Sequence, residues 1–420
     1  MSKALGVRNQ LPRVLFVAEA VTLAHVARPA ALIDCLDRTR FDTYFACDPR
    51  ARKFLTLDDT QLRWIDSIES REFSDRLRRG LPLYDAATLQ GYVEQDLALI
   101  DELRPDAVVG DFRLSLSVSA RLAGVPYACI ANAYWSPYAL NRSLPLPVLP
   151  WTPYVPLPLA QRVFDFFQPS LLATHCQPLN DVRISRALAP LPMDLRRIYT
   201  DADLTLYADD PRIFPLREAP ETHRHIGPVI WSPPVTLPPW WDQIDANLPT
   251  IYVTMGSSGN ARMLEAVLNA LSVLPVAIVA STAGATVPSG RWPNARIAEY
   301  LPGEQAAARS QLVVCNGGSP TSQQALAAGV PVLGICQNMD QLLNMREIAA
   351  AGLGEVIRAD RFTESALTMA ARRLLHAPKL NRAPEVAIAG LEPDGHTTAQ
   401  RFRAALARLL PGVEFGIAPA

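Results

Sequence analysis

The stretch Gln311–Gln341, QLVVCNGGSPTSQQALAAGVPVLGICQNMDQ, has the residue types and spacing that phosphate binding requires. Two adjacent glycines, Gly317 and Gly318, stand between a short apolar run and a helix-start signal. Ser319 lies where an N-cap is favoured and Pro320 at the first helical position. Glycines at that place let backbone N–H groups approach an anion, and the helix dipole favours negative charge there. The stretch predicts a phosphate site at the carboxyl edge of a parallel sheet, although a plain structural turn is the alternative.

A further candidate phosphate site lies earlier in the chain, where Gly256, Ser257 and Ser258 follow the apolar run Thr250–Met255. A strand that ends in Gly-Ser-Ser-Gly before a helix offers main-chain N–H groups and two hydroxyls to a phosphate. Ligands of an open α/β sheet bind outside the carboxyl ends of its strands, which is where this turn is predicted to lie.

One histidine and one aspartate also follow predicted buried strands. His25 comes after the apolar run Arg13–Ala18, and Asp111 comes after Asp106–Gly110. A neutral imidazole at the carboxyl end of a strand is placed to accept a proton near pH 7. A surface or helix-capping histidine is the alternative for His25, and a helix N-cap is the alternative for Asp111.

The elements that position these residues alternate between strands and helices in two long series, which predicts two doubly wound α/β sheets. The first series has strands at Arg13–Ala18, Phe41–Asp48, Asp106–Gly110, Pro126–Ala131, Ala202–Ala208 and His225–Trp231, and helices at Pro29–Leu36, Tyr84–Leu103 and Ser115–Ala123. The second has strands at Thr250–Met255, Val276–Ser281, Arg296–Leu301, Leu312–Val314, Val330–Ile335 and Glu355–Arg358, and helices at Ala261–Leu274, Glu304–Ser310, Thr321–Ala328, Gln341–Ala351, Thr363–His376 and His396–Leu410. His25 is expected in a loop, Glu19–Arg28.

Two segments rich in proline and tryptophan interrupt the alternation. Ala133–Pro169 is expected to be irregular, because proline disrupts both helices and central strands. It could be a surface segment or a membrane-docking lip, but an apolar wall around an acceptor pocket is favoured, since large apolar side chains usually cover something. Trp231–Asp242 is predicted to be a linker. We expect a first domain at residues 1–235, a second at 236–395, and a C-terminal helix and tail at 396–420 that can pack back on the first.

Length and composition restrict the class of protein. The 420 residues suit two domains, and 49% hydrophobic with 19% charged residues fit a globular enzyme. A net charge of −1 argues against a nucleic-acid partner. The six cysteines show no C-x-x-C spacing, the histidines lack partners at metal-ligand spacing, and neither a signal peptide nor a long apolar run is apparent. We expect a soluble cytoplasmic protein whose membrane contact is at most peripheral.

The stretch Gln311–Gln341 resembles the donor-nucleotide motif of the family 1 glycosyltransferases, the UDP-glycosyltransferase-like enzymes with a GT-B fold. Bacterial members of the macrolide and natural-product type carry His-Gly-Gly, then Thr, then Glu-Ala-Leu-x-x-Gly-Val-Pro, then a late Asp-Gln. The residues that match in register are Gly317, Gly318, Thr321, Ala325, Leu326, Gly329, Val330, Pro331, Asp340 and Gln341. The resemblance extends loosely over nearly the whole chain and implies two Rossmann-like domains that face each other across a cleft.

The resemblance also implies roles for individual residues. The family's general base is a histidine after the first strand, where His25 matches, and the carboxylate of its dyad stands at the position of Asp111. The residues that would bind the nucleotide-sugar donor are Gly256, Ser257, Ser258, Leu301, Asn316, Gly317, Gly318, Ser319, Thr321, Gln324, Asp340 and Gln341. Asp340 could instead be an ordinary N-terminal aspartate favoured by the helix dipole.

Four positions depart from the family pattern. Ala24 replaces a glycine, Asn316 a histidine, Gln324 a glutamate and Gly303 a glutamine. Asn316 can donate to a phosphate oxygen but carries no charge. Gln324 accepts through only one end of its amide, so it would hold two ribose hydroxyls less well than a carboxylate. An unusual donor would be recognised at these positions.

The expected function is inverting, metal-independent transfer of a hexose from a UDP- or dTDP-sugar to a hydroxyl of an apolar small-molecule or lipid-like acceptor, without a further cofactor. His25 would deprotonate the acceptor, Asp111 would stabilise the imidazolium, and the second-domain helix N-terminus would stabilise the departing diphosphate. A non-catalytic sugar-nucleotide-binding protein is an alternative, suggested by Asn316 and Gln324. A GT-B-fold nucleotide-sugar epimerase is a third possibility.

Overall fold

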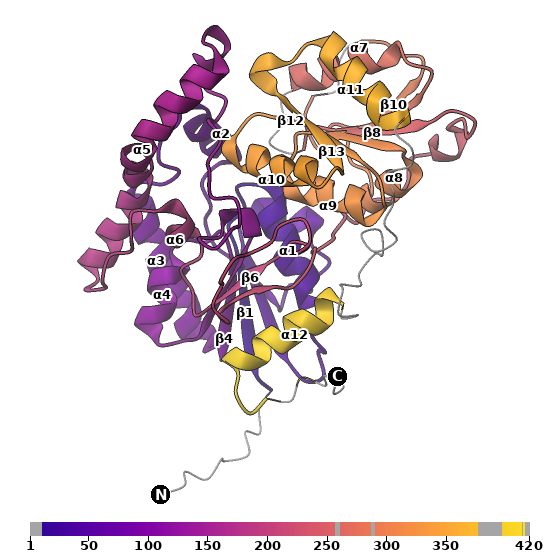
Figure 1. Cartoon of the computed structure of the whole chain (residues 1–420). Coiled ribbons are helices and arrows are strands. Elements are labelled where there is room, and N and C mark those ends of the chain that lie inside the picture. The colour runs from indigo at the N-terminus through magenta and orange to yellow at the C-terminus, as the bar shows by residue number, and fades with distance from the viewer. Residues whose placement is uncertain (1–10, 257–260, 287–289, 377–396, 414, 416–420) are drawn as a thin grey trace, which may run out of the picture.

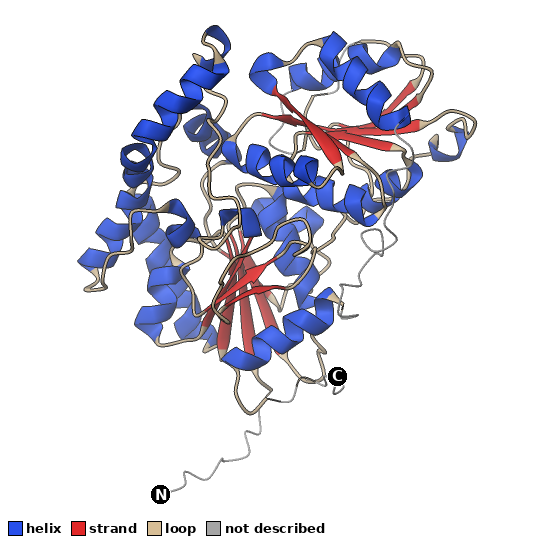
Figure 2. Ribbon diagram, in the orientation of Figure 1, coloured by secondary structure: helices blue, strands red, loops and turns tan. Residues whose placement is uncertain are grey.

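The computed structural model describes residues 11–256, 261–286, 290–376, 397–413 and 415, and two sheets lie in separate halves of the molecule (Figures 1 and 2). The first sheet has seven strands in the order β3-β2-β1-β4-β5-β6-β7, and the second has six in the order β10-β9-β8-β11-β12-β13. The described strands of both sheets pair in parallel. The expected pair of doubly wound, Rossmann-like sheets is thereby confirmed.

The first half contains strands that read as continuous apolar runs because helices cover both faces of the sheet. Its strands are β1 (Arg13–Ala18), β2 (Asp42–Cys47), β3 (Leu62–Trp64), β4 (Ala107–Asp111), β5 (Tyr127–Ala131), β6 (Leu204–Tyr207) and β7 (His223–His225). Its helices are α1 (Leu23–Ile33), α2 (Ser70–Arg79), α3 (Ala86–Leu103), α4 (Leu116–Ala123), α5 (Leu157–Ser185) and α6 (Leu195–Tyr199).

The second half follows the predicted alternation closely. Its strands are β8 (Thr250–Thr254), β9 (Ala277–Ser281), β10 (Ala295–Ala298), β11 (Leu312–Cys315), β12 (Val332–Cys336) and β13 (Gly354–Arg358). Its helices are α7 (Ala261–Ser272), α8 (Gly303–Arg309), α9 (Ser319–Ala327), α10 (Met339–Ala350) and α11 (Glu364–His376). Within the described ranges of the chain, no helix is both long and apolar enough to cross a bilayer.

The last helix, α12 (Thr398–Leu409), lies against the first sheet and not against the second (Figure 1). A capping box between Thr397 and Gln400 fixes its start. Phe402 is fully buried, and its ring centroid lies 6.1 Å from that of Phe16 in β1. The chain therefore crosses between the halves a second time to complete the core of the first.

The register of the first sheet brings polar residues to one edge. Ala18 of β1 is opposite Asp111 of β4, and the last residue of β5 is opposite the last residue of β6. Asn132 follows β5 directly, and Asp209 comes two residues after β6. Because the carboxyl ends of parallel strands meet at one edge, these side chains lie close together there.

The prediction that Ala133–Pro169 is irregular is wrong for the part inside α5. This helix continues through Pro169 and Pro178. A proline within a helix leaves the carbonyl four residues earlier without its N–H partner. Those carbonyls belong to Asp165 and Thr174, both exposed residues, so water can replace the missing bonds.

The prediction of a loop over Glu19–Arg28 holds for residues 19–22 but is wrong from Leu23 onward. Helix α1 begins at Leu23, with Pro29 inside it, so His25 lies in its first turn. The prediction of a strand at His225–Trp231 is wrong except for its first residue, because the last strand of the first sheet, β7, is His223–His225. It ends at His225 because the chain turns at Gly227, which has a φ of +85°.

The packing of α12 predicts that Phe402→Ala destabilises the first half of the molecule by about 3–5 kcal/mol, since it removes a fully buried aromatic ring. Hydrogen exchange followed by mass spectrometry should show faster exchange in β1 peptides than in wild type. Exchange in β11 peptides should change much less. Met369→Ala on α11, where the side chain is 54% exposed, is the control and should leave both regions within about 0.5 kcal/mol. Equal acceleration in both halves would contradict the assignment of α12 to the first.

Candidate active site

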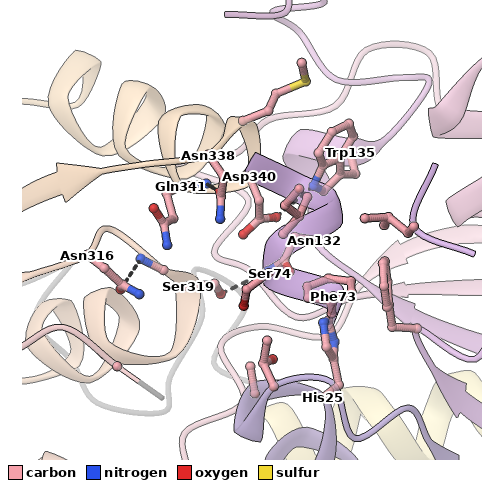
Figure 3. A pocket seen from close by; sticks show the side chains of 18 of the residues that line it. His25, Phe73, Ser74, Asn132, Trp135, Asn316, Ser319, Asn338, Asp340 and Gln341 are labelled. Carbon is pink, nitrogen blue, oxygen red and sulfur yellow. Dashed lines mark hydrogen bonds between the residues drawn. The ribbon is translucent and has the colours of Figure 1, made fainter. Parts of the chain in front are cut away.

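A cavity of about 700 Å³ lies between the two halves and is lined by both (Figure 3). It brings together most of the residues predicted from the sequence: His25, Gly256, Leu301, Asn316, Gly318, Ser319, Thr321, Gln324, Asp340 and Gln341. Asp111 and Gly317 lie behind this lining, and Ser257 and Ser258 fall outside the described residues. The structure therefore brings predicted residues of both halves to one cavity.

His25 and Asp111 are in hydrogen-bond contact. The Nδ1 atom of His25 lies 2.8 Å from Oδ1 of Asp111, which is completely buried at the end of β4. Arg28, one turn along α1, approaches the same Nδ1 atom at 3.2 Å. A carboxylate only accepts and a guanidinium only donates, so the shorter contact favours a proton on Nδ1. Nε2 is then left as an acceptor on a ring that points into the cavity (Figure 3).

Arg28 holds the Asp111 carboxylate from the other side, a contact that the sequence reasoning missed. Its Nε donates to Oδ2 and its Nη2 donates to Oδ1, both at 2.7 Å. This bidentate contact pairs a buried carboxylate with a positive charge. Without such a partner, burying the carboxylate would cost much of the free energy of folding. Arg28 comes three residues after His25 in the sequence, a spacing that puts both side chains on one face of a helix. This spacing could have indicated that Arg28 belongs to the site.

Phe112 places an aromatic face against the imidazole. The two rings are stacked, with centroids 4.6 Å apart and planes 10° apart. Phe112 has a φ of +57°, a left-handed conformation that is uncommon for any residue except glycine. The turn after β4 therefore needs support from its surroundings to keep this geometry.

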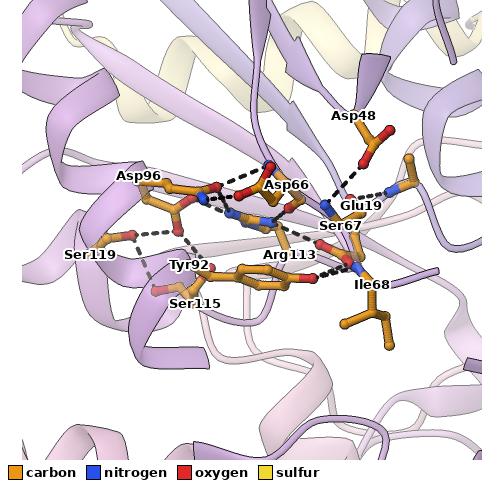
Figure 4. A network of polar contacts seen from close by, with 12 residues as sticks. Glu19, Asp48, Asp66, Ser67, Ile68, Tyr92, Asp96, Arg113, Ser115 and Ser119 are labelled. Atoms are coloured by element: carbon orange, nitrogen blue, oxygen red, sulfur yellow. Dashed lines mark hydrogen bonds and ion pairs between the residues drawn. The ribbon is translucent and has the colours of Figure 1, made fainter. Parts of the chain in front are cut away.

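Arg113 supplies that support through a buried polar network (Figure 4). Its guanidinium donates to Glu19 at 3.0 Å and to Asp96 at 3.1 Å, and it lies 3.7 Å from the centroid of the Tyr92 ring. Asp96 also accepts a hydrogen bond from Ser115 at 2.6 Å. Burial raises the pKa of Glu19, although the nearby Arg113 opposes that shift. The network fixes the residue next to Phe112 and so the turn itself.

Two polar residues at the same sheet edge link the dyad to the second half. Asn132 accepts from Nη1 of Arg28 at 2.8 Å and donates to Ser319 Oγ, across the cleft, at 3.0 Å. It also donates to Asp209 at 2.9 Å. Gln323 of α9 donates to the same Asp209 oxygen at 2.9 Å. A continuous chain of hydrogen bonds thus runs from Asp111 to α9. Asn132 and Asp209 come after buried strands and Ser319 opens a helix, a signal that the sequence reasoning did not use for Asn132 and Asp209.

In the glycine turn before α9, the main chain packs closely against neighbouring side chains. Gly317 has a φ of +81°, and a Cβ atom there would lie 2.6 Å from the sulfur of Cys336. Asn316 accepts from the Gly318 N–H at 3.1 Å, and its amide nitrogen would be 3.0 Å from a Cβ at Gly256. The two predicted phosphate turns therefore touch each other.

The expected N-cap of α9 is wrong by one residue. Gly318, in extended conformation, is the N-cap, and Ser319 is the first helical residue. Because Ser319 is not occupied in capping, its hydroxyl is directed across the cleft to Asn132.

Gln324 and Gly303, two of the departures from the family pattern, fit one another. The Gln324 amide donates to the Trp231 carbonyl at 2.6 Å, a contact that a glutamate could not make. A Cβ atom at Gly303 would lie 2.3 Å from the Gln324 oxygen. The missing side chain at one position therefore makes room for the amide at the other.

Asp340 and Gln341 open α10 behind the N-cap Asn338, whose side chain accepts from the Gln341 N–H at 3.0 Å. Asp340 accepts from the indole N–H of Trp135 at 2.8 Å, which joins the second half to the first. The Gln341 side-chain oxygen accepts from the Gln337 N–H at 2.8 Å. Among the residues that the structure describes, none accepts a hydrogen bond from its amide nitrogen, and Gln341 lines the cavity.

The first-half wall of the cavity is apolar. Close to His25 it is aromatic, and the ring of Tyr199 contacts those of both Phe112 and Trp135. Farther along, the lining comes from α2, α5 and the chain between them: Leu77, Leu81, Leu146, Leu149, Val163, Phe164, Phe167, Leu171 and Leu172. Among the residues that the structure describes, no three His, Cys, Asp or Glu side chains are grouped as a metal ion would need.

Comparison with known proteins gives both sequence and fold relatives. A family model for the C-terminal domain of erythromycin biosynthesis protein CIII-like proteins matches residues 265–390. A PGL/p-HBAD biosynthesis glycosyltransferase of Mycobacterium tuberculosis is 46% identical over 394 residues, covering 94% of this chain and 92% of the relative. A PGL/p-HBAD biosynthesis rhamnosyltransferase of Mycobacterium bovis is 48% identical over 384 residues, covering 90% and 84%. An inactive PGL/p-HBAD biosynthesis glycosyltransferase of the same species is 47% identical over 259 residues, covering 62% and 70%.

Solved structures with the same arrangement include the spinosyn forosaminyltransferase SpnP. It has a TM-score of 0.66 and 20% identity, covering 96% of this chain and all of that protein. The spinosyn rhamnosyltransferase SpnG, complexed with thymidine diphosphate, has a TM-score of 0.62 and 20% identity, covering 95% and 100%. At this identity the likeness establishes the fold alone.

The buried position of Asp209 predicts a pH-dependent effect of its replacement. Burial raises the pKa of Asp209 from 3.8 to about 6. The folded state therefore holds the proton more tightly than the unfolded state, and stability from this group is lost as the pH rises through 6. Asp209→Asn cannot ionise. Its destabilisation relative to wild type should be smaller at about pH 7.5 than at about pH 4.5, by on the order of 2 kcal/mol. Urea unfolding at both pH values measures this, and a difference that grows with pH would contradict it.

Proposed function

Because this chain belongs to the UDP-glycosyltransferase-like family of GT-B glycosyltransferases, we propose that it is an inverting enzyme that transfers a hexose from a UDP- or dTDP-sugar to a hydroxyl of an apolar, lipid-like acceptor. The observation that supports this most directly is the hydrogen-bonded pair of His25 and Asp111, which faces the glycine turn of α9 across one cavity.

In this mechanism the acceptor hydroxyl gives its proton to Nε2 of His25. The hydroxyl oxygen attacks the anomeric carbon, and the bond from that carbon to the diphosphate oxygen breaks on the opposite face. The Asp111 carboxylate would stabilise the imidazolium that forms, and Arg28 holds that carboxylate in position through two hydrogen bonds. The configuration at the anomeric carbon is inverted because attack and departure occur on opposite faces.

The leaving diphosphate would be stabilised by the second half. The N-terminus of α9 carries a partial positive charge. The main-chain N–H groups around Gly318 and the side-chain amide of Asn316 offer hydrogen-bond donors beside it. These groups need no metal ion to act, so the proposal includes metal-independent transfer. Asp340 and Gln341, at the N-terminus of α10, would contact the transferred sugar. The rhamnosyltransferase among the relatives makes a deoxyhexose a candidate sugar.

A non-catalytic sugar-nucleotide-binding protein is the second candidate. It is favoured by the relative that is described as inactive, which covers 62% of this chain. The contact between His25 and Asp111 opposes it, because a protein that only bound the nucleotide would have no use for an oriented imidazole. Donor binding without transfer to any acceptor would support it.

Replacing the proposed base should separate binding from catalysis. His25→Ala is expected to lower kcat for transfer by about 10²–10⁴-fold, since a general base contributes that much. The Kd for the donor should stay within about two-fold, because the donor contacts lie in the other half. His376→Ala, at an exposed histidine on α11, is the matched control. If His25→Ala kept wild-type kcat, another group would have to be the base.

The donor turn predicts that a negative charge at position 316 weakens donor binding. Asn316→Asp preserves the size of the side chain and the acceptor for the Gly318 N–H. It would place a carboxylate beside the diphosphate, and the Kd should rise at least about ten-fold. Thermal unfolding with saturating UDP- and dTDP-sugars measures this, because a bound donor raises the Tm by several degrees. Asn141→Asp, at an exposed position, should retain the full rise in Tm. An equal rise for Asn316→Asp would place the diphosphate elsewhere.

A further inference from the structure

The N-terminal half of α5 carries apolar side chains both where it packs on the first half and where it faces solvent. It packs into the first half through Ala160, Phe164, Leu172 and Cys176. Its solvent-exposed apolar side chains are Leu159, Val163, Phe166, Phe167 and Leu171, whose exposed fractions run from 48% to 79%. The solvent-facing side of a surface helix normally carries charged and polar side chains. The solvent-exposed side of this part of α5 is therefore more apolar than is usual for a surface helix.

Two aromatic residues that come just before the helix in the chain are also exposed. Trp151 is 46% exposed and Tyr154 is 86% exposed. We call these two side chains and the five exposed ones of α5 the α5 patch. Single apolar side chains are common on protein surfaces, but a contiguous group of them marks an interaction site.

The α5 patch is continuous with the wall of the active-site cavity. Trp151, Val163, Phe167 and Leu171 belong to both the exposed patch and the cavity lining. The C-terminal end of α2 lines the same cavity, and Figure 1 shows α2 beside the N-terminal part of α5 at an outer edge of the molecule. An apolar chain can thus extend from the patch toward His25 along apolar side chains.

The surroundings of the α5 patch are basic. The charged residues of α2 and of this half of α5 are Arg71, Arg76, Arg78, Arg79 and Arg162 against Glu72, Asp75 and Asp165, an excess of two positive charges. Arg76 and Arg78 pair with neighbouring acids of α2. Among the described residues, Arg71, Arg79 and Arg162 are in no ion pair and are exposed. Exposed arginines beside aromatic and aliphatic side chains fit the headgroup region of an anionic bilayer.

We propose that the α5 patch docks on the surface of a bilayer that contains anionic phospholipid. The patch would enter the headgroup boundary, and the arginines would contact phosphate groups. A lipid-like acceptor would then pass from the bilayer into the cavity with its hydroxyl leading. This inference rests on the proposed lipid-like acceptor and adds the surface from which that acceptor is taken.

The test is cosedimentation of the full chain with vesicles. Wild type should pellet with vesicles of equal parts phosphatidylcholine and phosphatidylglycerol, and much less with pure phosphatidylcholine. Leu159→Glu and Phe166→Glu should each lower the partition coefficient by roughly ten-fold or more, because each puts a charge where an apolar side chain would be buried. Neither residue lines the cavity, so transfer to a short water-soluble phenol should stay within about two-fold of wild type.

Two further sets of variants make the test specific. Arg71→Gln and Arg162→Gln should each weaken binding to the anionic vesicles by roughly five-fold and leave binding to neutral vesicles unchanged. Val273→Glu and Met369→Glu replace exposed apolar residues of the second half, 69% and 54% exposed, and should bind vesicles as wild type does.

Three outcomes would overturn the proposal. Wild type could stay in the supernatant with anionic vesicles, or the α5 variants could pellet as wild type does. Size-exclusion chromatography could instead show a dimer that Phe166→Glu dissociates, in which case a second copy of the chain covers the patch. Vesicle binding with the predicted variant effects, but no transfer to any acceptor, would overturn the proposed function and leave the docking surface standing.

Discussion

The carboxylate of Asp111 is the constraint on which the rest of the site depends. It ends the central strand β4 and is completely buried, where an unpaired charge would be very costly. Arg28 satisfies both of its oxygens, and to do so α1 must begin at Leu23 and turn its first face toward the sheet. The position of His25 follows, because it shares that face. The buried carboxylate of Asp111 thus determines where the imidazole of His25 lies, at the edge of the cavity.

The same carboxylate is connected to the second half of the molecule. Arg28 reaches Asn132, and Asn132 reaches both Ser319 of α9 and Asp209. These side chains are buried and almost fully paired, so shifting one half against the other would leave donors or acceptors without partners. Hydrogen bonds between strand ends and a helix start therefore contribute to how the two sheets face each other, together with contacts such as that of Trp135 with Asp340.

The cavity divides its chemistry between the two halves. The second half contributes helix N-termini and small polar side chains, which suit a charged diphosphate and a sugar. The first half contributes aromatic rings near His25 and aliphatic side chains beyond them. That division places a water-soluble donor and an apolar acceptor in adjoining environments of opposite character. It also explains why the exposed apolar face of α5 adjoins the acceptor end.

Local patterns in the sequence were enough to predict the two doubly wound sheets, the glycine turn at Gly317, and the place of Asp111 at the end of a strand. They placed His25 after the first strand but did not predict the helix that contains it. Short apolar runs between turn residues carry that information, because the spacing of apolar residues and the turn residues that end each element are local features of the sequence. The resemblance to a family added the roles of Gln324, Asp340 and Gln341, which stay predictions.

The continuous helix through Pro169 was not predictable, because solvent exposure decides whether the freed carbonyls find a partner. Only the tertiary structure paired Arg28 with Asp111, Asn132 with Ser319, and Gly303 with Gln324. Each of these contacts joins residues far apart in the chain, and nothing near either partner in the sequence specifies the other.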